Sequence, residues 1–133
     1  MPFNFSGNHK SSLAKMGVVF DGDTFVVADG SGQTVTSTLP GNTIFVKNPV
    51  RSATGVWSVT LKETVNEIMD LDVVTLLPSG DYLSTQLNLT TVDSLHRLVL
   101  HWTFNVAGTP TDLPSSGSPQ FVVFICYAET SNK

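Results

Sequence analysis

The sequence predicts an all-β domain, an antiparallel and jelly-roll-like β-sandwich of about eight to ten short strands with an N-terminal arm. Strand-like runs recur at roughly ten-residue spacing and are separated by clusters of Gly, Pro, Asn and Asp. Residues 55–62 alternate strictly between apolar and polar residues, and residues 96–106 alternate in the same way except at Val99. Only residues 63–70 could form a helical turn, and that stretch is too short to cover a sheet.

Residues 1–16 are expected to form the arm, and residues 17–133 a single β-sandwich domain, because no linker divides the rest of the chain. The arm is polar except for a few apolar residues that include Phe3 and Phe5. These two rings could anchor the arm in a neighbouring subunit, although chain ends are more often loosely ordered.

The expected strands follow from the apolar runs and the turn residues between them. They are residues 16–20, 24–28, 33–38, 43–47, 55–62, 71–77, 85–92, 96–106 and 121–127. Asp21-Gly22-Asp23 is interpreted as a tight hairpin turn between the first two. Residues 108–119 contain five Ser or Thr, three Pro and two Gly, which predicts a surface loop with a functional or spacer role.

The two alternating strands supply the predicted core. Their inward-facing residues are expected to be Trp57, Val59, Leu61, Leu98, Leu100, Trp102 and Phe104, with Val106 continuing the same face. Because aromatic side chains bury the largest area, the two tryptophans should dominate this core.

The last expected strand has no polar residue on either face. It consists of Phe121, Val122, Val123, Phe124, Ile125, Cys126 and Tyr127. Since successive side chains point to opposite faces, both sides must be covered. One set should pack in the domain core and the other against a partner, and the sequence leaves open which is which. A homo-oligomer, with a trimer favoured over a dimer, follows as the hypothesis.

Composition restricts the function classes. The net charge is −4 and the few Lys and Arg residues are scattered, which argues against nucleic-acid binding. No window approaches 18 apolar residues and no signal-peptide pattern opens the chain, so we expect no membrane span and synthesis in a cytoplasm. Cys126 cannot form an internal disulfide and is interpreted as a buried thiol.

No catalytic or metal-binding constellation is complete. Asp21, Asp23 and Asp29 fit no calcium-loop frame, and His96 and His101 should lie on opposite strand faces. We therefore expect no enzyme activity, no metal and no cofactor. A carbohydrate site remains open, because jelly rolls carry such sites, and Tyr82 is the one plausible exposed aromatic residue for it.

The segment Gly55-Val56-Trp57-Ser58-Val59-Thr60-Leu61 resembles a strand of small accessory structural proteins from tailed bacteriophages. The similarity covers about residues 50–128 and includes the later strand 98–106, the loop 108–119 and the final apolar strand. The layout is also similar to the trimeric jelly rolls of the complement globular-head and tumour-necrosis-factor type, at the level of architecture.

The resemblance implies a virion protein on the capsid surface, a decoration or cement protein that binds the major capsid protein and stabilises the shell. The alternatives are a phage tail or fibre component, or a carbohydrate-binding jelly-roll module. All three are binding functions without catalysis.

Overall fold

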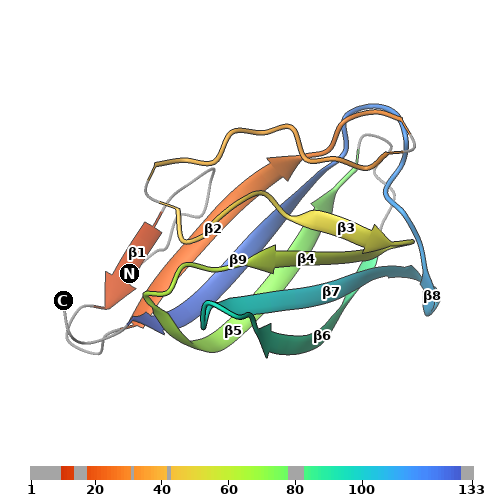
Figure 1. Ribbon diagram of the computed structural model, residues 1–133. Coiled ribbons are helices and arrows are strands. Elements are labelled where there is room, and N and C mark those ends of the chain that lie inside the picture. Colours follow the sequence, from red (N-terminus) through yellow and green to blue (C-terminus); the bar gives the residue numbers. More distant parts are fainter. Residues whose placement is uncertain (1–9, 14–17, 31, 42, 78–82, 130–133) are drawn as a thin grey trace.

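The computed structural model describes residues 10–13, 18–30, 32–41, 43–77 and 83–129, and in this part of the chain it is an all-β sandwich without a helix (Figure 1). The strands are β1 (Lys10–Leu13), β2 (Val18–Val26), β3 (Val50–Ala53), β4 (Val56–Thr60), β5 (Val65–Leu76), β6 (Ser84–Val92), β7 (Leu98–Val106), β8 (Thr109–Pro110) and β9 (Gln120–Glu129). The predicted fold class is confirmed.

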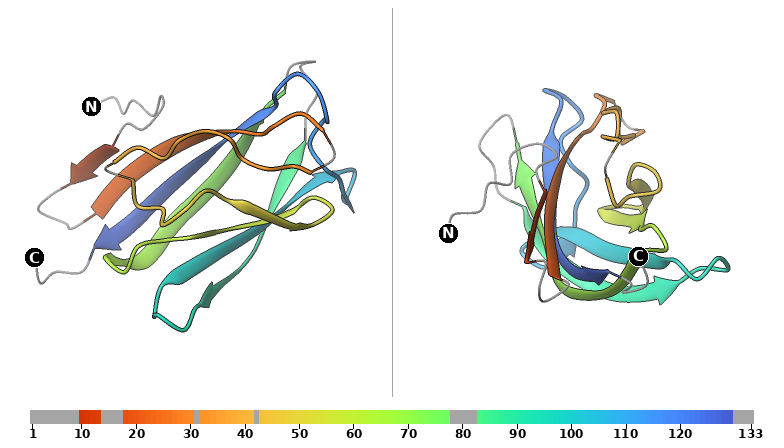
Figure 2. Two further views of the ribbon diagram at one scale, coloured as in Figure 1. Left: turned by 45° about the horizontal axis from the view of Figure 1, so that its top comes forward. Right: turned by 90° about the vertical axis from the view of Figure 1, so that its left-hand side faces the viewer.

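Two antiparallel sheets pack face to face (Figure 2). One has the order β1-β2-β9-β5, and the other has the order β3-β4-β7-β6 with β8 paired to β7. The chain crosses from sheet to sheet between β2 and β3, between β4 and β5, between β5 and β6, and between β7 and β9. The returning strands β7 and β9 insert between strands laid down earlier, which gives the wrapped, jelly-roll-like arrangement.

Phe121, at the start of β9, packs against four other aromatic rings of the core. Its ring centroid lies 5.2 Å from Trp57, 5.8 Å from Trp102, 5.6 Å from Phe104 and 5.5 Å from Phe25. Trp57 and Trp102 are themselves register partners across β4 and β7. These tilted and edge-on arrangements are the ones that aromatic pairs prefer.

The structure buries six of the seven residues expected in the core and places the seventh, Leu98, partly buried at its margin. The six are Trp57, Val59, Leu61, Leu100, Trp102 and Phe104. Val106 differs, because it is 48 % exposed at the end of β7, where the pairing strand is only the two-residue β8. Alternation therefore predicted the burial along β7 but not the exposure at its last residue.

The predicted turn at Asp21-Gly22-Asp23 is wrong. β2 runs through all three residues, and nine consecutive pairs join it to β9, from Val18↔Ala128 to Val26↔Gln120. Both carboxylates lie on the core face, with Asp21 3 % and Asp23 2 % exposed. Thr43 donates a hydrogen bond from Oγ1 to Asp23 Oδ2 at 2.8 Å. Long-range pairing and a buried hydroxyl donor thus override a local turn signal.

Three further predictions made from local patterns differ from the structure, because long-range pairing decides where the strands lie. Residues 63–70 are mostly strand, since β5 begins at Val65, and two register shifts before Asp70 interrupt the alternation there. Residues 33–38 and 43–47 form no strands and make only isolated bridges, Val27↔Val35 and Phe45↔Leu61. In the predicted arm, residues 10–13 form the edge strand β1, whereas Phe3 and Phe5 lie outside the described residues.

Segment 27–49, orange to yellow in Figure 1, closes one side of the sandwich. It pairs first with the end of β2, through Thr36 N–H to Val26 O at 2.8 Å, and later with the end of β4, through Val46 N–H to Thr60 O at 2.9 Å. Its side chains Val35, Ile44 and Phe45 are buried in the core. The segment therefore replaces two predicted strands with a bridge between the sheets.

Most of residues 108–119 are exposed, as predicted for a surface loop, but the middle of the loop packs against segment 27–49. Leu113 is buried, and the Gln33 side chain both donates to Leu113 O at 2.8 Å and accepts from Leu113 N–H at 3.2 Å. Asp112 receives two hydrogen bonds from Arg51 at 2.8 and 2.9 Å and one from Gly55 N–H at 2.8 Å. These contacts hold the end of the sandwich where β3, β4 and β8 meet.

Candidate assembly surface

The final strand β9 is central in its sheet, with β2 on one side and β5 on the other. Phe121, Val123, Ile125 and Tyr127 point into the core and are at most 2 % exposed. Val122, Phe124 and Cys126 therefore project from the outer face. Because the first set packs within the chain itself and Val122 is also buried, at 7 % exposed, the interface hypothesis is restricted to the half-buried Phe124 and Cys126.

The outer face of β2-β9-β5 continues the apolar character of β9. Phe20 on β2 is the register partner of Cys126, and Val74 on β5 is the register partner of Val122. Val74 is 40 % exposed, and Leu76, two residues further along the same face, is 50 % exposed. Sequence reasoning missed these two, although the spacing Asp70-x-Asp72-x-Val74-x-Leu76 assigns all four to one face.

The outer face of the opposite sheet has a different chemistry. Its outward residues on β4, β6 and β7 include Ser58, Thr60, Gln86, Asn88, Thr91, His101 and Thr103. Several of these side chains form hydrogen bonds with one another. Asn88 Nδ2 donates to Thr103 Oγ1 at 2.9 Å, and Thr91 Oγ1 lies 2.9 Å from His101 Nε2. The outer face of β4, β6 and β7 thus carries hydrogen-bonded polar side chains beside the 49 % exposed Val50 of β3, whereas the outer face of β5 carries the exposed Val74 and Leu76 beside Asp70 and Asp72.

Charge is distributed unevenly across the apolar sheet. β5, at one edge, contains Glu67, Asp70 and Asp72 and no basic residue. β1, at the opposite edge, contains Lys10 and no acidic residue. Lys10 is the register partner of the buried Asp21. The acidic residues of this sheet's two edge strands therefore all lie on β5.

Cys126 lies on the outer face, beside Asp70 in the register with β5. Burial raises the pKa of the thiol, and the neighbouring Asp70 carboxylate raises it further. Since the thiolate is the reactive form, Cys126 is poorly suited to be a nucleophile.

The candidate ligands considered in the sequence do not converge. Asp21 and Asp23 face the core, whereas Asp29 is exposed and accepts from Ser118 N–H at 2.7 Å. His96 lies in the β6–β7 turn at φ 61°, apart from His101 on β7. Within the described ranges, no three His, Cys, Asp or Glu residues come together as a metal site. Tyr82, the candidate sugar contact, lies outside those ranges.

No protein-family profile, curated protein or solved structure matches the chain. The part of the chain that the structure describes contains no helix that is long and apolar enough to cross a membrane.

Proposed function

We propose that the protein is a non-enzymatic virion component, a capsid decoration or cement protein of a tailed bacteriophage, which acts as a homo-oligomer and binds the major capsid protein. The observation that carries the assembly role is the contrast between the two outer faces of the sandwich. The resemblance of residues 55–61 to phage accessory proteins supports the virion assignment.

The surface between copies is proposed to be the β5 side of the sheet, where Val74 and Leu76 are exposed, and its occupant a second copy of the chain. Charge complementarity favours a head-to-tail copy, because β1 contains Lys10 and no acidic residue, whereas a two-fold arrangement would bring two acidic β5 strands together. Head-to-tail contacts that close generate rings, which agrees with a trimer.

The proposed mechanism is binding alone. Burying Val74, Leu76 and their neighbours contributes roughly 25 cal/mol per Å² of apolar surface, so one contact is modest. A ring that engages several coat subunits at once gains from effective concentration, and many modest contacts then hold a shell firmly.

Oligomeric state tests the surface. By light scattering at micromolar concentration, we expect a trimer for the wild-type chain and a smaller species for Val74→Asp/Leu76→Asp. Ser58→Asp/Thr60→Asp, on the outer face of β4, is the matched control and should leave the mass unchanged. A monomeric wild-type chain, or an equal response of both double variants, would contradict the proposed surface.

Virion composition tests the biological role. Mass spectrometry of purified virions should find the protein at a copy number comparable to that of the coat protein, and a density map should place it on the capsid surface. A few copies per particle would favour the tail or fibre alternative instead. Glycan binding that is lost on Tyr82→Ala would favour the carbohydrate-binding alternative.

A further inference from the structure

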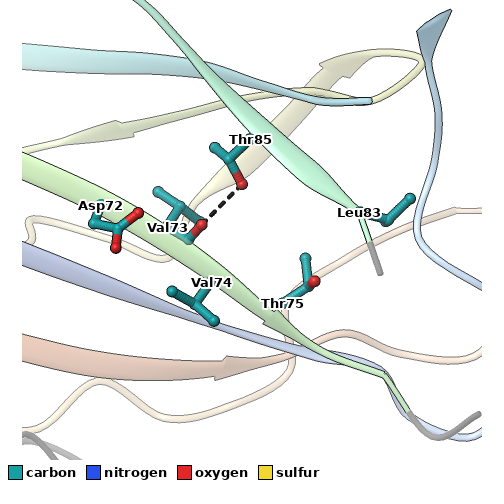
Figure 3. A pocket seen from close by; sticks show the side chains of 6 residues that line it. All are labelled: Asp72, Val73, Val74, Thr75, Leu83 and Thr85. Carbon is teal, nitrogen blue, oxygen red and sulfur yellow. Dashed lines mark hydrogen bonds between the residues drawn. The ribbon is translucent and has the colours of Figure 1, made fainter. Parts of the chain in front are cut away.

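The side of the sandwich where β5 faces β6 contains an open cleft. It has a volume of about 280 Å³ and is lined by Asp72, Val73, Val74, Thr75, Leu83 and Thr85 (Figure 3). Val73 and Leu83 are buried and make part of the lining apolar, whereas Asp72 and Val74 are exposed. A cavity of about 150 Å³ holds benzene, so this larger cleft has room for one branched aliphatic side chain.

The turn between β6 and β7 is held in one conformation by Asp93. Oδ1 of Asp93 accepts hydrogen bonds from Leu95 N–H at 3.0 Å and from Arg97 N–H at 2.9 Å, and Oδ2 accepts one from Arg97 Nε at 2.9 Å. The backbone adds bonds from Asp93 N–H to Arg97 O at 2.9 Å and from His96 N–H to Asp93 O at 3.0 Å. Residues 93–97 are therefore a preorganised element.

This turn presents an aliphatic side chain to solvent. Leu95 is 57 % exposed, and its neighbours Ser94 and His96 are also exposed. Val92, the last residue of β6, is 60 % exposed beside the turn. An exposed aliphatic residue on a rigid turn can fill a pocket of a partner with little loss of conformational entropy, because the turn is already ordered.

The turn cannot reach the cleft of its own chain. Thr85, which lines the cleft, is the register partner of Phe104. Val92, next to the turn, is the register partner of Leu98. Six residue steps of β7 separate these two partners and span roughly 20 Å. The cleft and the turn thus lie at opposite ends of β6 (Figure 1), so Leu95 can enter such a cleft only on another copy.

Charge complementarity favours this contact between copies. β5 contains Glu67, Asp70 and Asp72 and no basic residue, and Asp72 lines the cleft. The turn brings no net negative charge to this strand, because Arg97 neutralises Asp93. Within the described residues, Arg97 donates from its side chain only through Nε, so its two terminal amino groups are available to a carboxylate on another molecule.

We infer that the β6–β7 turn of one copy inserts Leu95 into the β5–β6 cleft of the next copy, with Arg97 beside Asp72. Each copy then provides one turn and receives one, and head-to-tail contacts of this kind close into a ring. The inference rests on the proposed self-association and assigns the surface that meets Val74 on the neighbouring copy.

The first experiment compares variants of the full chain by light scattering over a concentration series. Leu95→Ser should weaken assembly at least tenfold, whereas Ser94→Ala, at the neighbouring exposed position, should change it less than twofold. Thr75→Trp, which fills the cleft, should act like Leu95→Ser. Circular dichroism and melting temperature will show whether Thr75→Trp folds, and Leu95→Ser decides the outcome if it does not.

The second experiment tests which surfaces meet. Two chains of different mass, one with Leu95→Cys and one with Thr75→Cys, each also with Cys126→Ala, are co-expressed and oxidised. A disulfide between the two different chains is expected. Ser58→Cys, on the outer face of β4, replaces Thr75→Cys in the control pair and should form at least tenfold less of the mixed disulfide.

The outcomes separate this inference from the proposed function. If Val74→Asp/Leu76→Asp dissociates the oligomer but Leu95→Ser leaves its mass and association constant unchanged, the turn-in-cleft inference is overturned and the assembly surface stands. Mixed disulfide that forms as readily through Ser58→Cys as through Thr75→Cys also overturns the inference. A monomeric wild-type chain overturns both.

Discussion

The two sides of the sandwich are closed in different ways. Between β2 and β4, segment 27–49 fills the gap with buried Ile44 and Phe45 and makes hydrogen bonds to both sheets. Between β5 and β6, the Thr85–Val73 hydrogen bond spans a cleft of about 280 Å³. A side that the chain closes by itself contributes to stability, whereas a side left open at a regular strand edge is available for another chain. The following predictions test this distinction.

The largest difference should come from side chains on the two sides. Phe45 is 2 % exposed and its ring centroid is 5.4 Å from that of Phe25, so Phe45→Ala should cost about 3–5 kcal/mol of the free energy of unfolding. Leu87→Ala, at the open side, should cost about 1 kcal/mol because that side chain is already 44 % exposed. Urea unfolding of both variants measures the contrast, and equal losses would show that the sides do not differ.

Gly55, between β3 and β4, and Gly108, between β7 and β8, should show a smaller difference in stability. Gly55 has φ +71°, and a Cβ there would lie 2.7 Å from Thr111 N and 2.8 Å from Phe104 O. Gly55→Ala should cost about 1–2 kcal/mol for the backbone conformation and a further 1–3 kcal/mol, roughly, for the clash. Gly108 has φ +82° with nothing within 4 Å, so Gly108→Ala should lose only the first part. Thermal unfolding should rank the pair in that order, and the reverse order would refute the close approach.

The smallest expected effect is the pH dependence of the Asp112 contacts. Hydrogen bonds from the Arg51 side chain, and then from Gly55 N–H, hold the pKa of Asp112 below its ordinary value despite some burial. A lowered folded-state pKa stabilises the fold above the unfolded-state value of about 3.9, and this contribution disappears as the pH falls through the folded-state value.

Asp112→Asn should therefore lower the free energy of unfolding by about 1 kcal/mol at pH 7, and by less at pH 3. Urea unfolding at both pH values measures the change. The exposed Glu63→Gln serves as a control and should have little effect at pH 7. A loss for Asp112→Asn that grows on acidification would contradict the assigned direction of the pKa shift.

The local sequence pattern was sufficient to predict burial where a residue's environment depends on its own strand. Alternation assigned Trp57, Val59 and Leu61 to one face, and their burial follows because β4 is covered along its whole length. The uninterrupted apolar run of β9 predicted a central strand, and β9 lies between β2 and β5, whereas cover of its outer face by a partner stays a prediction. It did not distinguish Phe121 from Val122, because two adjacent apolar residues carry no signal about which faces the second sheet.

The sequence by itself determined the all-β class and most of the aromatic core, since side-chain periodicity is a property of each strand. The tertiary structure alone decided that Asp21-Gly22-Asp23 lies inside β2, that segment 27–49 closes one side, and that residues 73–76 pair in regular register with β9. These features depend on which distant segment supplies the hydrogen bonds. Pairing register and sheet order are long-range choices that no local pattern encodes.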